Sequence, residues 1–193
     1  MRIRYAFESF LAAATLCAVA ATLMASPKAG PPDTTTIAVH QQDSQNHTRV
    51  LLQQIQQEAI DIRNNADQLQ MLAWNPLVGW DDDGNILANL RDQVNKLDQL
   101  LSYVREHEAQ ASPLQRRTID LMAPPSLELA TTTQDAIVTL DNNEAYVYMT
   151  DLDGLAKDIY NEANRVDMAV GDLDKYMIAR REEQQVKQSL GIK

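Results

Sequence analysis

The feature that most constrains this fold is an apolar stripe in the segment 83–110, whose members recur in alternating steps of three and four. Its members are Leu87, Leu90, Val94, Leu97, Leu101 and Val104. This spacing predicts an amphipathic α-helix with a coiled-coil-like seam, which partner helices must cover at a shallow crossing angle. The acidic run 81–83 precedes the stripe and suits the positive end of the helix dipole.

Three further segments carry stripes of the same period, and we expect them to form the partner helices. Helices are predicted at about 44–74, 113–141 and 144–188. The first stripe comprises Leu51, Ile55, Ala59, Ile62, Ala66, Leu69 and Ala73. The second comprises Ile119, Met122, Ser126, Leu129, Thr133, Ala136 and Leu140. The third comprises Leu152, Leu155, Ile159, Ala163, Val166, Val170, Leu173 and Met177.

The connections between these segments are short. Ser112, Pro113 and Gln115 form the pattern of a capping box with proline at the first helical position. Pro124-Pro125 predicts a kink in the third helix, and the fourth helix should outlast the others by about three turns. The predicted fold is all-α, an antiparallel up-down-up-down four-helix bundle. An extended pair of helical hairpins that dimerise would share every local feature.

The N-terminal region resembles an export signal in its composition. Arg2 and Arg4 precede an apolar run at 11–25 that is too short to span a membrane comfortably. We expect a signal peptide at 1–25, cleaved after Ala25, and a periplasmic or secreted protein; an uncleaved membrane anchor is the alternative. Residues 26–43 predict a flexible leader and 189–193 a short tail.

Cys17 is the sole cysteine of the chain and lies within the predicted signal. Leu16 precedes it, where a lipoprotein signal would need a small residue, so lipid attachment is disfavoured. The mature chain would then contain no disulfide and no thiol nucleophile.

The net charge of -10 argues against a nucleic-acid partner, which requires a basic face. The sequence contains no phosphate-binding glycine loop, no nucleophile elbow and no Glu-x-x-His pair of the di-iron bundles. We therefore expect no enzymatic activity and no cofactor.

The string 81–86 partly matches a calcium-binding loop. Asp81 and Asp83 would supply two ligand positions of an EF-hand-like loop. The first and twelfth positions would be Gly79 and Leu90, neither of which offers a side-chain ligand. Helix capping explains the acidic run without an ion.

Two histidines suggest a haem or metal site as an alternative. His47 and His107 should come to the same end of the bundle, with Met177 at a similar height. His47 lies on the extrapolated apolar stripe, whereas glutamates flank His107 and indicate solvent. Two surface histidines are the simpler interpretation.

The opposite end is predicted to be aromatic and acidic. It gathers Trp74, Trp80, Tyr146 and Tyr148, with Asp81 to Asp83, Asp151 and Asp153 around them. Such a patch could bind a cationic or sugar-like ligand. The preferred interpretation is that the rings plug the bundle end and bury Leu77 and Val78.

Together these patterns favour an exported, non-enzymatic bundle that acts through a protein partner or as a homo-oligomer in the cell envelope. Membrane contact is expected only through an uncleaved signal segment. A small-ligand sensor at the tryptophan end and a haem or metal carrier at the histidine end are the two alternatives.

Overall fold

The computed structural model describes residues 34–75, 77, 79–143 and 146–190, with side chains from Asp43 onward. The expected signal peptide and the first part of the expected leader lie outside these residues. The helices are α1 (Thr34–Ala73), α2 (Trp80–Glu106), α3 (Pro113–Asn142) and α4 (Leu152–Ser189), with 3₁₀ turns η1 (Glu108–Gln110) and η2 (Val147–Met149). Within the described part of the chain no strand occurs, so the prediction of an all-α protein with four helices is confirmed.

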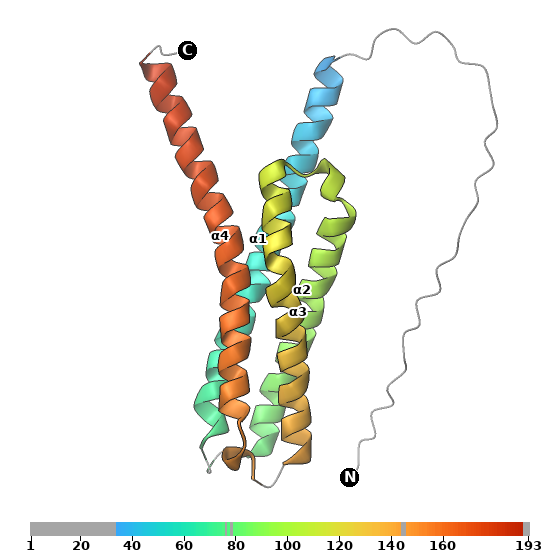
Figure 1. The fold of residues 1–193 in the computed structure, drawn as a ribbon, viewed down its shortest axis with the longest axis vertical. Coiled ribbons are helices and arrows are strands. Elements are labelled where there is room, and N and C mark those ends of the chain that lie inside the picture. Colours follow the sequence, from blue (N-terminus) through green and yellow to red (C-terminus); the bar gives the residue numbers. More distant parts are fainter. Residues whose placement is uncertain (1–33, 76, 78, 144–145, 191–193) are drawn as a thin grey trace, which may run out of the picture. The chain divides into compact units, whose positions relative to one another are not determined.

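Successive helices run in opposite directions, with both α1 and α3 pointing toward one end (Figure 1). α1 packs against α2 and α4, and α3 packs against the same two helices. The α1–α4 contact is the most extensive of the four, although these helices are farthest apart in sequence. The four helices of one chain therefore cover one another, and the extended pair of hairpins is not the arrangement observed.

The core is built from the stripes that the sequence predicts. Every predicted stripe residue of α2 and α3 is buried. In α1, Leu52 takes the buried position expected for Leu51, and in α4 Ala156 is buried where Leu155 is only half-buried. An adjacent residue is buried in both cases, because steps of three and four only approximate the turn of about 3.6 residues. The spacing therefore locates the buried side of the helix only to within one residue.

Two helix starts differ from expectation. α1 begins at Thr34 rather than near residue 44, since no glycine or proline interrupts residues 34–75. α4 begins at Leu152 rather than near 144, because residues 147–149 form the 3₁₀ turn η2 instead of the first turn of the helix. Val147 is instead buried within η2, and its carbonyl accepts a hydrogen bond from Thr150 Oγ1 at 2.7 Å.

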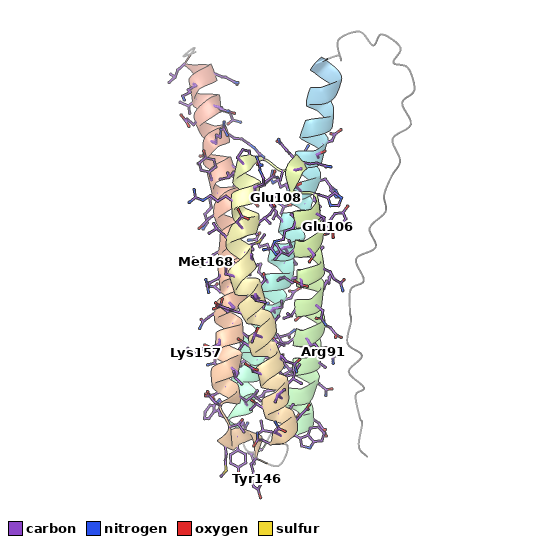
Figure 2. All side chains as sticks on the ribbon, turned by 45° about the vertical axis from the view of Figure 1, so that its right-hand side comes forward. Arg91, Glu106, Glu108, Tyr146, Lys157 and Met168 are labelled. Carbon is purple, nitrogen blue, oxygen red and sulfur yellow. The ribbon has the colours of Figure 1, made fainter. Side chains whose placement is uncertain are left out.

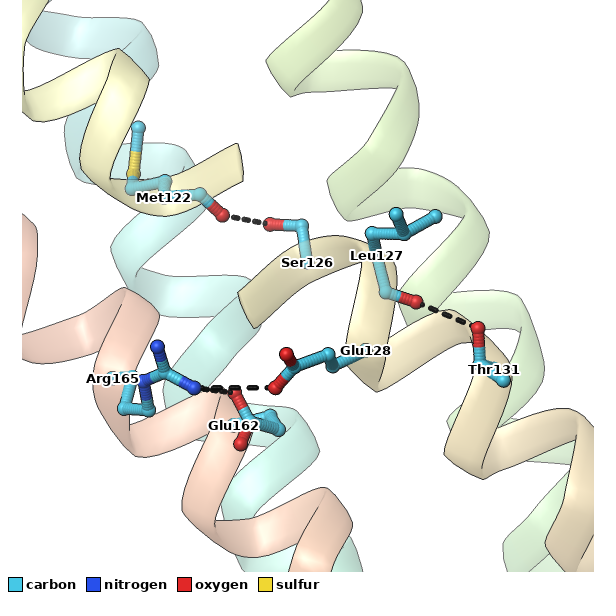
Figure 3. A network of polar contacts seen from close by, with 7 residues as sticks. All are labelled: Met122, Ser126, Leu127, Glu128, Thr131, Glu162 and Arg165. Atoms are coloured by element: carbon cyan, nitrogen blue, oxygen red, sulfur yellow. Dashed lines mark hydrogen bonds and ion pairs between the residues drawn. The ribbon is translucent and has the colours of Figure 1, made fainter. Parts of the chain in front are cut away.

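α3 continues without a break through Pro124 and Pro125. Each proline lacks the N–H that an α-helix uses to bond the carbonyl four residues earlier. Directly after them Ser126 Oγ donates to the Met122 carbonyl at 2.8 Å, as Figure 3 shows. The helix keeps its predicted register on both sides of the prolines, so it stays on the same partners; a bend at this point stays a prediction.

Polar side chains link the helices outside the core. Between α1 and α4, Asp167 accepts hydrogen bonds from Gln56 at 2.8 Å and from Arg63 at 2.9 Å. Between α3 and α4, Arg165 Nη1 lies 3.2 Å from Glu128 and 2.7 Å from Glu162 on its own helix (Figure 3). Burial raises the pKa of Glu162, while Arg165 opposes that shift. Such half-exposed pairs each contribute below about 1 kcal/mol, so they set the helix partners more than they stabilise the fold.

Candidate functional site at the loop end

The α1–α2 loop and the α3–α4 connection lie at the same end of the bundle, as predicted (Figure 1). We call this the loop end and define it as the described residues within 70–83 and 140–153. The opposite, open end comprises the α2–α3 connection at 107–112 and the parts of α1 and α4 that extend past it.

The large apolar side chains of the loop end are exposed. Leu77 is 93% exposed, Met149 72% and Trp74 69%. Met71, Trp80, Tyr146 and Tyr148 are exposed as well. Figure 2 shows the Tyr146 side chain extending from this end of the bundle. We call these seven residues the aromatic patch.

The expectation that the rings plug the bundle end is therefore wrong. The core is closed at this end by smaller side chains, namely Ala73, Ile86, Leu140, Val147 and Leu152, all of which are buried. Because these side chains already fill the space between the helix ends, the rings and Leu77 remain outside. Val78, the other residue expected to be buried, lies outside the described residues.

One shallow hollow belongs to the aromatic patch. Gln70, Met71, Trp74 and Asp153 line a space of about 290 Å³ that is open to solvent. The structure thus brings an indole ring and a carboxylate together, as the sequence predicted for this end. Leu77 is held on the loop beside it by a hydrogen bond from its N–H to Asn75 Oδ1 at 3.1 Å.

The loop end carries acidic residues and no basic ones. The sequence has no lysine or arginine between Arg63 and Arg91, nor between Arg117 and Lys157. The described acidic residues of the loop end are Asp81, Asp82, Asp83, Asp141, Asp151 and Asp153. An uncompensated negative potential therefore surrounds the aromatic patch.

Asp83 differs from its neighbours. Asp81 and Asp82 are exposed in the first turn of α2, whereas Asp83 is 3% exposed. Its Oδ1 is buried without a hydrogen-bond partner, and burial, with a smaller contribution from the charge of Asp82, raises the pKa of Asp83.

The three aspartates do not form a calcium loop. They lie in a helical turn, which directs their side chains to different sides. In the described part of the chain, no group of three metal-ligating side chains converges.

The two histidines come to the open end but do not face each other. The Tyr103 ring lies between them, 6.3 Å from His47 and 4.3 Å from His107, centroid to centroid. His107 Nδ1 also lies 2.8 Å from the Tyr103 carbonyl oxygen. His47 is exposed, as the interpretation of two surface histidines expects, and Thr48 takes the buried position that the extrapolated stripe assigned to His47.

A second shallow hollow adjoins these rings. Its volume is about 400 Å³, and its walls are His47, Leu51, Lys96, Gln99, Leu100 and Tyr103. His107 and Met177 are not among them. Tyr103 was missed as a site residue by sequence reasoning, although its position four residues before His107 places both on one helix face.

Among the described helices, none combines the length and apolar character needed to cross a membrane. No protein-family model, curated protein or solved structure matches this chain. Its function is therefore inferred from the chemistry of its own surfaces.

Proposed function

We propose that this chain is an exported, non-enzymatic helical-bundle protein that binds a protein partner through its loop end. The observation that supports this proposal is the aromatic patch, in which seven large apolar side chains are exposed on one end of a bundle whose core is closed beneath them. Clustered exposed apolar residues mark contact surfaces, whereas isolated ones need no explanation.

The composition of the patch also favours a protein partner. Tryptophan, tyrosine and methionine are enriched in protein interfaces, where their large side chains supply most of the binding free energy. The residues come from α1, the α1–α2 loop, α2 and η2, so the surface is broad. The hollow at Trp74 is small and open, whereas small-molecule sites usually enclose most of their ligand.

Capture from the envelope fraction of the native host tests this proposal. The bait is the purified chain, compared with a loop-end variant carrying Trp74→Ser and Leu77→Ser. Leu127→Ser is the matched control, because Leu127 is exposed on α3 outside the loop end. We expect wild type and the control to retain a defined partner that the loop-end variant loses by at least tenfold, about 1.4 kcal/mol. Equal retention by all three baits would contradict the proposal.

The export part of the proposal is supported by Arg2, Arg4 and the apolar run 11–25. N-terminal sequencing of the protein recovered from the periplasm or medium tests it. We expect a first residue at Ser26. An intact N-terminus in the cytoplasmic fraction would contradict export.

A small cationic ligand is the second candidate, because Trp74 and Asp153 line the same hollow. An indole face and a carboxylate together bind quaternary ammonium groups. Titration with tetramethylammonium should change the tryptophan fluorescence of wild type but not of Asp153→Asn. Identical curves for the two proteins would remove this candidate.

A further inference from the structure

We propose that the partner of the loop end is the open end of a second copy, specifically the projecting part of α4. This inference rests on the proposed function of the loop end and names its partner. We define the arm as residues 175–190, which comprise the end of α4 and its C-cap Leu190, and this part of α4 extends past the α2–α3 connection (Figure 1).

The arm carries apolar side chains that no described part of its own chain covers. No described residue of α4 after Leu173 is fully buried, whereas the stripe before it is buried almost completely. The exposed large apolar residues of the arm are Tyr176, Ile178, Val186 and Leu190. Both ends of the bundle therefore expose apolar surface, which a contact between them would cover.

Three of these residues share one side of the helix. Tyr176, Val186 and Leu190 are ten and four residues apart, which at about 100° per residue places all three within an arc of about 80° on the α-helix. That side is turned away from the core stripe that ends at Val170 and Leu173. The arm thus presents a face of its own, suited to a second surface and not to an extension of the bundle core.

The charges of the two ends are complementary. The arm contains Lys175, Arg180, Arg181 and Lys187 against Glu182 and Glu183, in a chain whose net charge is -10. Lys187 pairs with Glu183 at 2.6 Å and Lys175 with Asp172 at 3.0 Å. Arg180 and Arg181 lie in no ion pair with a described carboxylate, and Arg180 interacts electrostatically with Glu183 on its own helix. Both guanidinium groups are exposed and can approach the acidic loop end of a second copy.

Charge also selects against the other pairings. Two loop ends would bring only negative charges together, and like charges across an interface oppose association. Contact of an arm with a loop end joins opposite signs and covers apolar residues on both sides. A head-to-tail contact of this kind leaves one loop end and one arm free, so it grows into a filament or closes into a ring.

Two variants blocked at opposite ends test the proposal. The loop-end variant carries Trp74→Ser and Leu77→Ser, and the arm variant carries Arg180→Glu, Arg181→Glu and Val186→Ser. All five positions are exposed, so both bundles should fold, which circular dichroism checks. Sedimentation equilibrium then gives the mass of each protein alone and of an equimolar mixture.

We expect the mass of wild type to rise with concentration and to fall with added salt. Each variant alone should be a monomer. Their mixture should form a one-to-one dimer and nothing larger, because only one productive contact can form. Leu127→Ser should behave as wild type.

Other outcomes overturn the inference. A wild type that stays monomeric up to roughly 1 mM overturns it, and so does a loop-end variant that still self-associates, which would indicate arm-to-arm contact. If wild type is monomeric and yet captures a different protein through the aromatic patch, the second copy is excluded while the proposed function stands. If the loop-end substitutions change neither capture nor mass, both proposals fail.

Discussion

At both ends of the bundle a connection reverses the direction of the chain, but the hydrogen bonds of the two connections differ. At the open end Ser112 accepts from the Gln115 N–H at 3.3 Å, and Gln115 Oε1 accepts from the Ser112 N–H at 2.8 Å. Gln115 Nε2 also donates to the Gln45 carbonyl at 2.9 Å, which ties α3 to α1. At the loop end neither Gly79 nor Asp151 makes a side-chain cap bond. The polar side chains of the α2–α3 turn thus fix the start of α3 and its position against α1. The helix starts at the loop end lack such bonds, and the side chains exposed there can contact another molecule.

The largest test of this comparison sets a core residue of α1 against a residue of the loop end. Leu69 is fully buried, while Leu77, on the loop that follows, is 93% exposed. We expect Leu69→Ala to lower the free energy of unfolding by about 2–5 kcal/mol, through lost burial and a cavity. Leu77→Ala should change it by less than about 0.5 kcal/mol. Urea unfolding measures both, and a large loss for Leu77→Ala would mean that the loop is part of the core.

The next effect concerns the buried carboxylate of the loop end. Burial raises the pKa of Asp83 above its ordinary 3.8. The folded state therefore loses stability as the pH rises from 3.8 through the folded-state pKa, and the full cost of the ionised group is present above that pKa. Asp83→Asn should therefore stabilise the protein at pH 7 by on the order of 1 kcal/mol. The advantage should vanish as the pH falls below 3.8.

Asp81→Asn is the matched control for that measurement. Asp81 is exposed in the same helical turn, where its charge favours the helix dipole, so its loss should destabilise by about 0.3–1 kcal/mol. Thermal unfolding at several pH values separates the two. If both substitutions changed the stability in the same direction, the result would show that Asp83 is solvated.

The smallest effect compares the two turns directly. Ser112→Ala should cost about 1 kcal/mol, because it removes the cap of α3. Gly79 caps α2 in an extended conformation, with φ -76° and ψ 145°, and no atom would contact an added Cβ. Gly79→Ser should therefore stabilise by only a few tenths of a kcal/mol. Chemical denaturation measures the free energy of unfolding of both variants. An effect of Gly79→Ser as large as that of Ser112→Ala would contradict the prediction that the two turns differ.

Much of the fold could be predicted, because periodicity reports directly on which side of a helix is buried. The α2 seam and the α3 register through Pro124-Pro125 were both located to the residue. The α4 start could not be placed, since burial of Val147 in a 3₁₀ turn depends on its neighbours in space. The polar contacts of Gln56 and Arg63 with Asp167 were also missed, because the spacing within α1 indicates only a solvated face.

The location of the aromatic residues was predicted from the sequence, but their exposure was not. The aromatic residues come together at the loop end as their positions along antiparallel helices require. Whether they fill that end depends on the volumes of Ala73, Val147 and Leu152, which close the core first. Periodicity does not report such volumes, so the exposed patch had to be learned from the packing.

The extent of the α1–α4 contact has a consequence for how the chain folds. The contacts of α2 with α1 and α3 join adjacent segments and require only short loops to close, so they form quickly. α1 obtains its most extensive contact only from the helix farthest from it in sequence. During synthesis, the side of α1 that later contacts α4 therefore stays uncovered until α4 has been made. The slow step of folding should be the arrival of α4, and substitutions at its buried Ile159 or Val166 should slow folding more than equal substitutions in α2.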